Sequence, residues 1–261
     1  MKKYILIISL ITLFASCEKV IELDLDNVEP KLVVEAVITD QPGPHYVKLS
    51  KSVNFNEPSV YPYVDNALVV ITDNTGVVDT LQYTENGIYQ TSKIEGVMGR
   101  MYDLKIIVDD QTYTSRSTMP KKVNFDTTVV IDFQFGPSLL KYIIPIYKDP
   151  QELGNKYRFL LTVNGIKDKG ILVFNDNVNN GQYNGQPLRS SDISIKSGDV
   201  VQVEMQTINE EIYNYFYTLG QISARGGGGG STPANPPSNI SGGALGNFSV
   251  VTTQTKTVTI P

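Results

Sequence analysis

Histidine, cysteine and tryptophan are almost absent from this sequence of 261 residues, which contains one, one and none of them. A Ser-His-Asp or Cys-His arrangement therefore has only His45 available, and a zinc site built from histidine and cysteine cannot be assembled. His45 follows two prolines in QPGPHYVKL, and we interpret it as a surface turn residue. The single cysteine, Cys17, excludes a disulfide within the chain. The missing tryptophan weakens a carbohydrate-binding function without excluding it.

An excess of basic residues is also missing. The chain has 22 Lys and Arg against 27 Asp and Glu, which gives a formal net charge of -5 at pH 7. Nucleic-acid binding requires a basic face, so we expect no nucleic-acid partner. The charge balance leaves sugars, metals, small molecules and proteins open as ligands, and it does not choose among them.

Paired carboxylates are the remaining route to acid/base catalysis, as in glycoside hydrolysis. The candidates Asp65, Asp73, Asp79, Asp109 and Asp110 all stand in turn-like contexts, where aspartate is favoured because it bonds its own backbone. No pair is singled out, so we expect no catalytic residues and no enzyme. A carboxylate-dependent hydrolase remains the minor alternative.

The stretch NDNVNNGQYNG, residues 175–185, superficially suggests a calcium loop. A loop of the EF-hand type needs a glycine at its sixth position and a closing glutamate at its twelfth. Counted from Asn175, those positions hold Asn180 and Gln186, and Asp176 is the only carboxylate. We interpret the stretch as a polar hairpin tip, and we expect neither a metal site nor a cofactor.

The beginning of the chain, MKKYILIISLITLFASC, has two lysines, an apolar run over residues 4–14 and two small residues before Cys17. That layout is typical of an export signal, and eleven apolar residues are too few for a transmembrane helix, which needs about 20. The stretch resembles a bacterial lipoprotein signal, which implies that residues 1–16 are removed and that Cys17 is lipidated. The alternative is that Cys17 is an ordinary buried cysteine.

The segment 17–29 is acidic, with Lys19 as its only basic residue, and we interpret it as a tether. Acidic residues soon after a lipidated cysteine resemble the surface-export signals of lipoproteins in the Bacteroidota. A solvated linker without such a signal is the alternative.

Apolar residues alternate with polar ones along most of the remaining chain, as at Leu32, Val34, Ala36 and Ile38, and again over residues 102–108 and 129–135. Period two indicates strands with one buried and one wet face, and turn residues separate the segments. We predict a mainly β protein of two antiparallel β-sandwich domains. Residues 30–120 form an immunoglobulin-like or prealbumin-like sandwich, and residues 121–261 form a second β domain.

One helix is predicted in the second domain, over residues 208–223. Thr207 and Glu210 are spaced as a capping box, and Asn209 is the alternative cap. A glycine-rich loop follows over residues 226–247. We expect its five consecutive glycines to be slack, its second half to be ordered, and the final stretch, residues 247–260, to be a strand that closes the second sheet.

A loop over residues 57–66, EPSVYPYVDN, carries Tyr61 and Tyr63 between prolines. Aromatic side chains on a stiff loop can stack on sugars or act as protein hot spots, so these two tyrosines are the candidate ligand-binding residues. The alternative is a connection whose tyrosines pack down on the sandwich.

Two stretches, CEKVIELDLDNVEPKLVVEAVITD and PPSNISGGALGNFS, resemble the Bacteroidota lipoproteins grouped as domain-of-unknown-function family 4249. The resemblance covers essentially all of the chain after the signal. It implies a cell-envelope location and a gene beside an outer-membrane TonB-dependent receptor, and it supplies no catalytic residues.

We therefore hypothesise a non-enzymatic lipoprotein, anchored in the outer membrane through Cys17 and exposed on the cell surface. Its function would be a binding or assembly accessory to a TonB-dependent receptor in nutrient or metal uptake. The alternatives are a structural or adhesive surface lipoprotein without a transport partner, and attachment to the leaflet that faces the periplasm.

Overall fold

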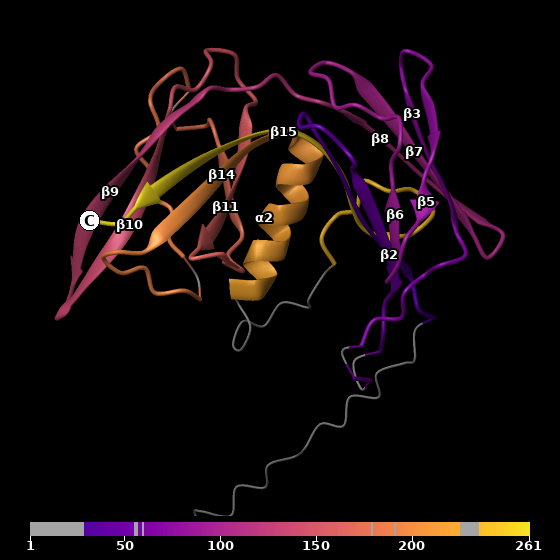
Figure 1. Cartoon of the computed structure of the whole chain (residues 1–261), viewed down its shortest axis with the longest axis horizontal. Helices are drawn as coiled ribbons and strands as arrows, with labels where there is room; N and C mark the ends of the chain where they lie inside the picture. The colour runs from indigo at the N-terminus through magenta and orange to yellow at the C-terminus, as the bar shows by residue number, and fades with distance from the viewer. Residues whose placement is uncertain (1–28, 55–56, 59, 179, 191, 225–234) are drawn as a thin grey trace, which may run out of the picture.

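The computed structural model describes residues 29–54, 57–58, 60–178, 180–190, 192–224 and 235–261 (Figure 1). The predicted signal peptide, Cys17, most of the tether and the five glycines lie outside the described residues. The described chain is mainly β with one helix, so the predicted fold class is confirmed. In the part of the chain that the structure covers, no helix is long and apolar enough to cross a membrane.

The first half of the chain forms two facing layers. One layer has the strand order β15-β1-β2-β6-β5 and the other β4-β3-β7-β8. The first eight strands are β1 (Leu32–Thr39), β2 (Tyr46–Lys51), β3 (Leu68–Asp73), β4 (Val78–Thr80), β5 (Gln82–Tyr83), β6 (Ile88–Gln90), β7 (Met101–Val108) and β8 (Gln111–Thr118). Their core follows the predicted alternation, since Val34, Ala36 and Ile38 of β1 are completely buried.

The second half contains a long hairpin, a sheet and the helix (Figure 1). Its elements are β9 (Phe125–Phe135), β10 (Ser138–Tyr147), β11 (Lys156–Val163), β12 (Ile166–Lys167), β13 (Leu172–Asn175), β14 (Val200–Ile208), α2 (Glu210–Ala224) and β15 (Leu245–Thr259). A second hydrophobic core lies between the hairpin and the sheet β12-β11-β14-β15, with Phe125 of β9, Phe159 of β11 and Val203 of β14 at its centre.

Strand β15 belongs to both halves. Its first seven residues, 245–251, pair in parallel with β1, and residues 252–259 pair antiparallel with β14. The last strand was predicted to close the second sheet, and only its second part does so. Its first part lies in the first sandwich, where Phe248 and Val250 join the first core. The boundary at Pro120 stays a prediction, but the two halves share one continuous sheet.

The segment before β15 is held against β8, as expected for an ordered second half of the glycine-rich loop. The Ser241 backbone N–H donates to the Thr114 carbonyl at 2.8 Å, and the Ser115 hydroxyl donates to the Asn239 carbonyl at 2.7 Å. Ile240 is buried in the first core. The prediction that this segment belongs to the fold is therefore correct, although it packs on the first sandwich and not on the second domain.

Helix α2 begins at Glu210 and is capped by Asn209. The Asn209 side-chain oxygen accepts from the Ile212 backbone N–H at 3.0 Å, which satisfies a donor of the first turn. Thr207 is still part of β14, paired with Thr252, so the capping box of Thr207 and Glu210 does not form. The alternative cap is the correct one, because the strand continues to Ile208 before the chain turns.

Candidate functional site

The hairpin of β9 and β10 lies at one end of the described chain and forms a two-stranded sheet of its own (Figure 1). Eleven residues of β9 and ten of β10 are joined through a tip at Gly136 and Pro137. The two strands pair with each other from Phe135 and Ser138 down to Phe125 and Tyr147. The hairpin is therefore a long antiparallel ribbon with two distinct faces.

The inner face of the ribbon packs on the second core. Ile143 is completely buried, and its cross-strand partner Val130 packs against the same cluster. Further toward the tip, this face carries the cross-strand pair Lys141 and Asp132, which form a 2.7 Å ion pair, and then Leu139 opposite Gln134. Side chains alternate along a strand, so every second residue must point the opposite way, away from the core.

The opposite face carries seven apolar side chains, with Ser138 beside Phe135 at its tip end, and we call these seven the outer hairpin face: Val129, Ile131, Phe133, Phe135, Leu140, Tyr142 and Ile144. Three of these side chains are strongly exposed, with relative accessibilities of 43% for Val129, 45% for Phe133 and 68% for Phe135. Phe133 stacks on Tyr142 with ring centroids 5.2 Å apart. The period-two pattern at residues 129–135 correctly predicted a strand, but the apolar side that should be buried faces outward.

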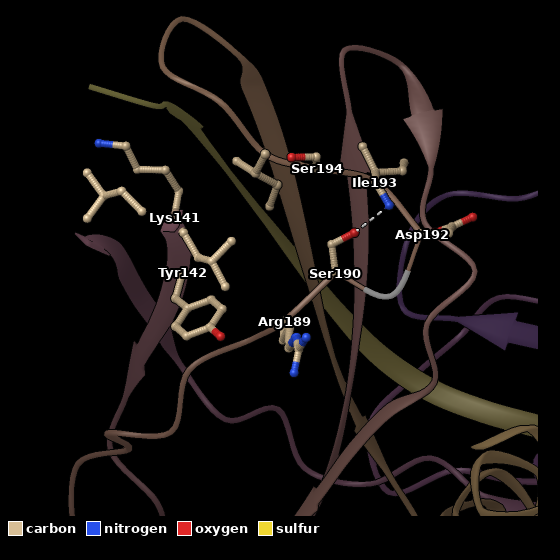
Figure 2. A pocket seen from close by; sticks show the side chains of 10 residues that line it. Lys141, Tyr142, Arg189, Ser190, Asp192, Ile193 and Ser194 are labelled. Atoms are coloured by element: carbon tan, nitrogen blue, oxygen red, sulfur yellow. Dashed lines mark hydrogen bonds between the residues drawn. The ribbon is translucent and has the colours of Figure 1, made fainter. Parts of the chain in front are cut away.

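A pocket of about 290 Å³ opens beside β10, between residues 139–142 and the segment of residues 189–190 and 192–195 (Figure 2). The segment is held in place at Leu188, whose N–H donates to the Ile143 carbonyl at 2.7 Å. The Ser190 hydroxyl donates to Asp168 and accepts from the Ile193 N–H at 3.0 Å. Hydrogen bonds therefore join the two walls of the pocket to each other and tie the second wall to Asp168.

The pocket combines apolar and polar groups. Leu139, Leu140 and the Tyr142 ring come from the hairpin, and Arg189, Ser190 and Ser194 come from the opposite wall. Figure 2 shows the Tyr142 ring on the side of the pocket that faces Arg189 and Ser190. Such a surface can accept an apolar anchor while its guanidinium and hydroxyl groups bond to polar atoms beside it. This combination suits the contact with another protein.

The candidate residues Tyr61 and Tyr63 lie on the other half of the molecule, on the segment after β2. Both rings are more than half exposed, so they do not pack down on the sandwich. Val64 anchors the segment in the first core instead, and the Lys48 Nζ lies 6.0 Å from the centroid of the Tyr63 ring. The structure does not bring these tyrosines to the hairpin pocket, and ligand binding by them stays a prediction.

His45 is buried, with 5% of its surface accessible, so its interpretation as a surface turn residue is wrong. Its backbone N–H donates to the Thr91 hydroxyl at 2.8 Å and its carbonyl accepts from the Thr91 N–H, which continues the β2–β6 pairing toward His45. The burial that results lowers the pKa of the imidazole. The adjacent prolines suggested a turn, but long-range pairing determines the exposure.

Two of the turn aspartates hold the first sandwich together. Burial alone would raise the pKa of Asp73, but hydrogen bonds from Thr75 and Val77 and the Arg100 guanidinium at 2.8 Å outweigh it and lower the pKa. Asp79 is fully buried; burial opposes its charge, and hydrogen bonds from the backbone N–H groups of residues 92–94 lower its pKa. These contacts give both carboxylates a structural role.

The stretch 175–185 is not the polar hairpin tip that its sequence suggests. Its described residues fold back on the chain after β10, where Asp176 accepts backbone hydrogen bonds from Gly154 and Asn155 and is almost fully buried. Within the described ranges, no group of three or more His, Cys, Asp or Glu side chains is placed to hold a metal ion.

The fold and the hairpin define a class of protein: two β-sandwich-like halves sharing one sheet, with an apolar ribbon exposed at one end. The model of a family described as a domain of unknown function, DUF4249, matches residues 18–257, so the chain belongs to this family. No curated protein matches the chain. Family membership agrees with the resemblance seen in the two quoted stretches.

Proposed function

We propose that the protein is a non-enzymatic binding or assembly lipoprotein whose outer hairpin face contacts a partner protein. It is anchored in the outer membrane through a lipid on Cys17, lies on the cell surface, and acts as an accessory to a TonB-dependent receptor in nutrient or metal uptake. The observation that carries the binding function is the outer hairpin face, seven apolar side chains on the solvent side of a ribbon.

Apolar surface in contact with water is unfavourable in free energy, and a partner that covers the outer hairpin face would remove this penalty. Contiguous apolar patches are unusual on soluble monomers and mark interaction sites. Fully burying one large apolar side chain contributes about 1.5–3 kcal/mol, and aromatic residues are enriched among the anchors that dominate binding energy. Phe135 has most of this contribution still to gain and Phe133 somewhat less than half of it, since they are 68% and 45% accessible.

The hairpin is also preorganised, which reduces the entropy lost on binding. Its inner face is fixed by Ile143 and Val130 in the second core, and Phe133 is fixed on the outer side by its stack on Tyr142. A partner therefore meets a ribbon whose backbone and aromatic rings are already in place. The pocket next to Tyr142 adds hydrogen-bonding groups at the edge of the same surface.

The test is co-purification from the native outer membrane in mild detergent. We compare the wild-type chain with Phe135→Asp on the outer hairpin face and with the matched control Gln134→Asp, one residue away on the other face. The yield of an outer-membrane receptor should fall at least about tenfold for Phe135→Asp, because the lost burial exceeds 1.4 kcal/mol. Gln134→Asp should recover the wild-type amount.

Equal receptor yields for the two variants would refute the outer hairpin face as the contact. Recovery of the intact wild-type chain with no receptor would refute the accessory function and favour the structural or adhesive alternative. Protease treatment of intact cells tests the location independently, since a chain that is left uncut would place it on the periplasmic side.

A further inference from the structure

A small cavity of about 10 Å³ lies away from the hairpin pocket, where the ends of β10 and β13 meet the segment 180–190. It has room for one particle of the size of a water molecule. Every side chain that lines it carries an oxygen atom: Tyr147, Asp149, Tyr157, Asn175, Asp176, Gln182, Asn184 and Gln186. The carboxylate, amide and phenol oxygens among these side chains are the ligand atoms that hard cations prefer.

Asp149 is the first carboxylate of this cavity, and only 4% of its surface is accessible. Its Oδ1 accepts from the Tyr157 hydroxyl, and its Oδ2 accepts from the Gly181 N–H at 3.2 Å. Both oxygens of Asp149 therefore accept from neutral donors. Among the described residues, no lysine or arginine forms an ion pair with Asp149.

Asp176 is the second carboxylate and is only 1% accessible. Its Oδ2 accepts from the backbone N–H groups of Gly154 at 2.6 Å and Asn155 at 2.8 Å. Its Oδ1 is buried and accepts no hydrogen bond. Burying a carboxylate oxygen without a hydrogen-bond donor costs free energy of folding. The position of Asp176 Oδ1 therefore indicates that a cation or a donor binds there.

Lys156 is the nearest cationic group to Asp176, but it does not neutralise the cavity. Its Nζ lies 3.9 Å from Asp176 Oδ1, beyond hydrogen-bonding distance, and closer to Glu210, at 3.4 Å. It also lies 5.6 Å from the centroid of the Tyr213 ring. Glu210 and Tyr213 both belong to α2, so Lys156 keeps favourable partners there when another cation approaches Asp176.

We propose that this cavity binds one calcium ion, with Asp149 and Asp176 as its charged ligands and amide or phenol oxygens of the lining completing the shell. Of the two buried carboxylates, only Asp176 has an ion pair among the described residues, and its lysine also pairs with Glu210, so the cavity carries excess negative charge. Calcium accepts irregular sets of oxygen ligands. Magnesium usually retains several waters, for which a cavity of about 10 Å³ has no room.

The proposed ligands come from three separate segments of the chain. Asp149 follows β10, Asp176 follows β13, and Gln182, Asn184 and Gln186 belong to the segment after them. The Asp149 N–H donates to the Gln182 carbonyl at 2.9 Å, which joins two of these segments directly. Bound calcium would therefore tie the hairpin to the second sheet, and we expect it to stabilise the fold.

The experiment uses the full chain in detergent after removal of metals with a chelator. Terbium replaces calcium in oxygen sites and luminesces when a nearby tyrosine is excited, and Tyr147 and Tyr157 line the cavity. We expect saturable terbium luminescence that calcium displaces and magnesium does not. For a site of the extracellular class, with a Kd of about 10⁻⁴–10⁻³ M, 10 mM calcium should raise the unfolding midpoint by roughly 3–10 °C.

Asp176→Asn should abolish both the luminescence and the calcium-induced shift, whereas the matched control Asp110→Asn, in the exposed turn between β7 and β8, should retain both. If Asp176→Asn does not fold, the displacement of terbium from the wild-type chain still decides the question. No terbium signal, equal displacement by magnesium, or a calcium shift that Asp176→Asn keeps would each overturn the proposal and leave a water site.

Discussion

The Asn239 side chain bonds both backbone groups of Phe248, donating from its Nδ2 to the carbonyl at 3.0 Å and accepting at its Oδ1 from the N–H at 2.9 Å. The amide thus occupies the place of a neighbouring strand beside the first part of β15. Without it, two backbone groups in a largely buried segment would lose their partners.

Asn239→Ala should therefore lower the free energy of unfolding by about 1–3 kcal/mol, the cost of leaving buried polar groups unsatisfied. Urea unfolding followed by circular dichroism measures the change. The control is Asn177→Ala, an exposed position that should stay within about 0.5 kcal/mol of wild type. An Asn239→Ala variant as stable as this control would show that the clamp is dispensable.

Gly246 lies where β15 passes closest to β1. Its φ is +93°, and a Cβ built there would lie 2.0 Å from the Val34 carbonyl oxygen. Gly243 has a similar φ of +81°, but a Cβ built at Gly243 would have no other atom within 4 Å. Gly243→Ala should cost about 1–2 kcal/mol for the left-handed backbone alone. Gly246→Ala should lower the free energy of unfolding clearly more, because the main chain of β1 also has to move. Thermal unfolding of the two variants therefore separates the cost of the left-handed backbone from the cost of the contact with Val34.

His45 is the chain's one histidine, and histidine is the side chain whose ordinary pKa, about 6.5, lies between pH 7 and pH 5. Burial lowers its folded pKa below the ordinary value of 6.5, so the unfolded chain binds the proton more readily. The contribution of His45 to the free energy of unfolding is complete above the unfolded pKa of about 6.5. It is lost as the pH falls from there toward the lower folded pKa. His45→Gln should flatten this part of the stability curve, as measured by urea midpoints at several pH values. An unchanged slope in the variant would contradict the assignment.

Cys17 lies outside the described residues, and its lipidation is tested chemically. Metabolic labelling with a fatty-acid analogue should mark the wild-type chain, and Cys17→Ala should abolish the label and release the protein from the membrane fraction. Acyl chains contribute about 0.8 kcal/mol per buried methylene, so loss of the anchor should be close to complete. A labelled or membrane-bound Cys17→Ala chain would point to a different attachment.

Local pattern predicted a large part of this fold. Period two identified β1, β7 and β9, because half-buried strands need alternating side chains whatever their partners are. The helix was predicted to within about two residues, and Asn209 was named as one of two caps. These features depend on neighbours in sequence.

Features that depend on distant segments could not be predicted in the same way. The parallel pairing of residues 245–251 with β1 joins the two ends of the described chain, and nothing in either strand specifies that partner. His45 is buried for the same reason, through Thr91. The outer hairpin face shows the limit of periodicity, which finds an apolar side at residues 129–135 but does not say whether the chain itself covers it.

The shared strand β15 also sets an order of events in folding. It follows every other described strand in sequence, yet it lies between β1 and β14 in the middle of the long sheet. Neither half can complete its sheet until this stretch has been made and has entered between two strands formed much earlier. A chain released before residue 245 would therefore expose unpaired edges on β1 and β14 together, and the two halves should gain their final stability in a single late step.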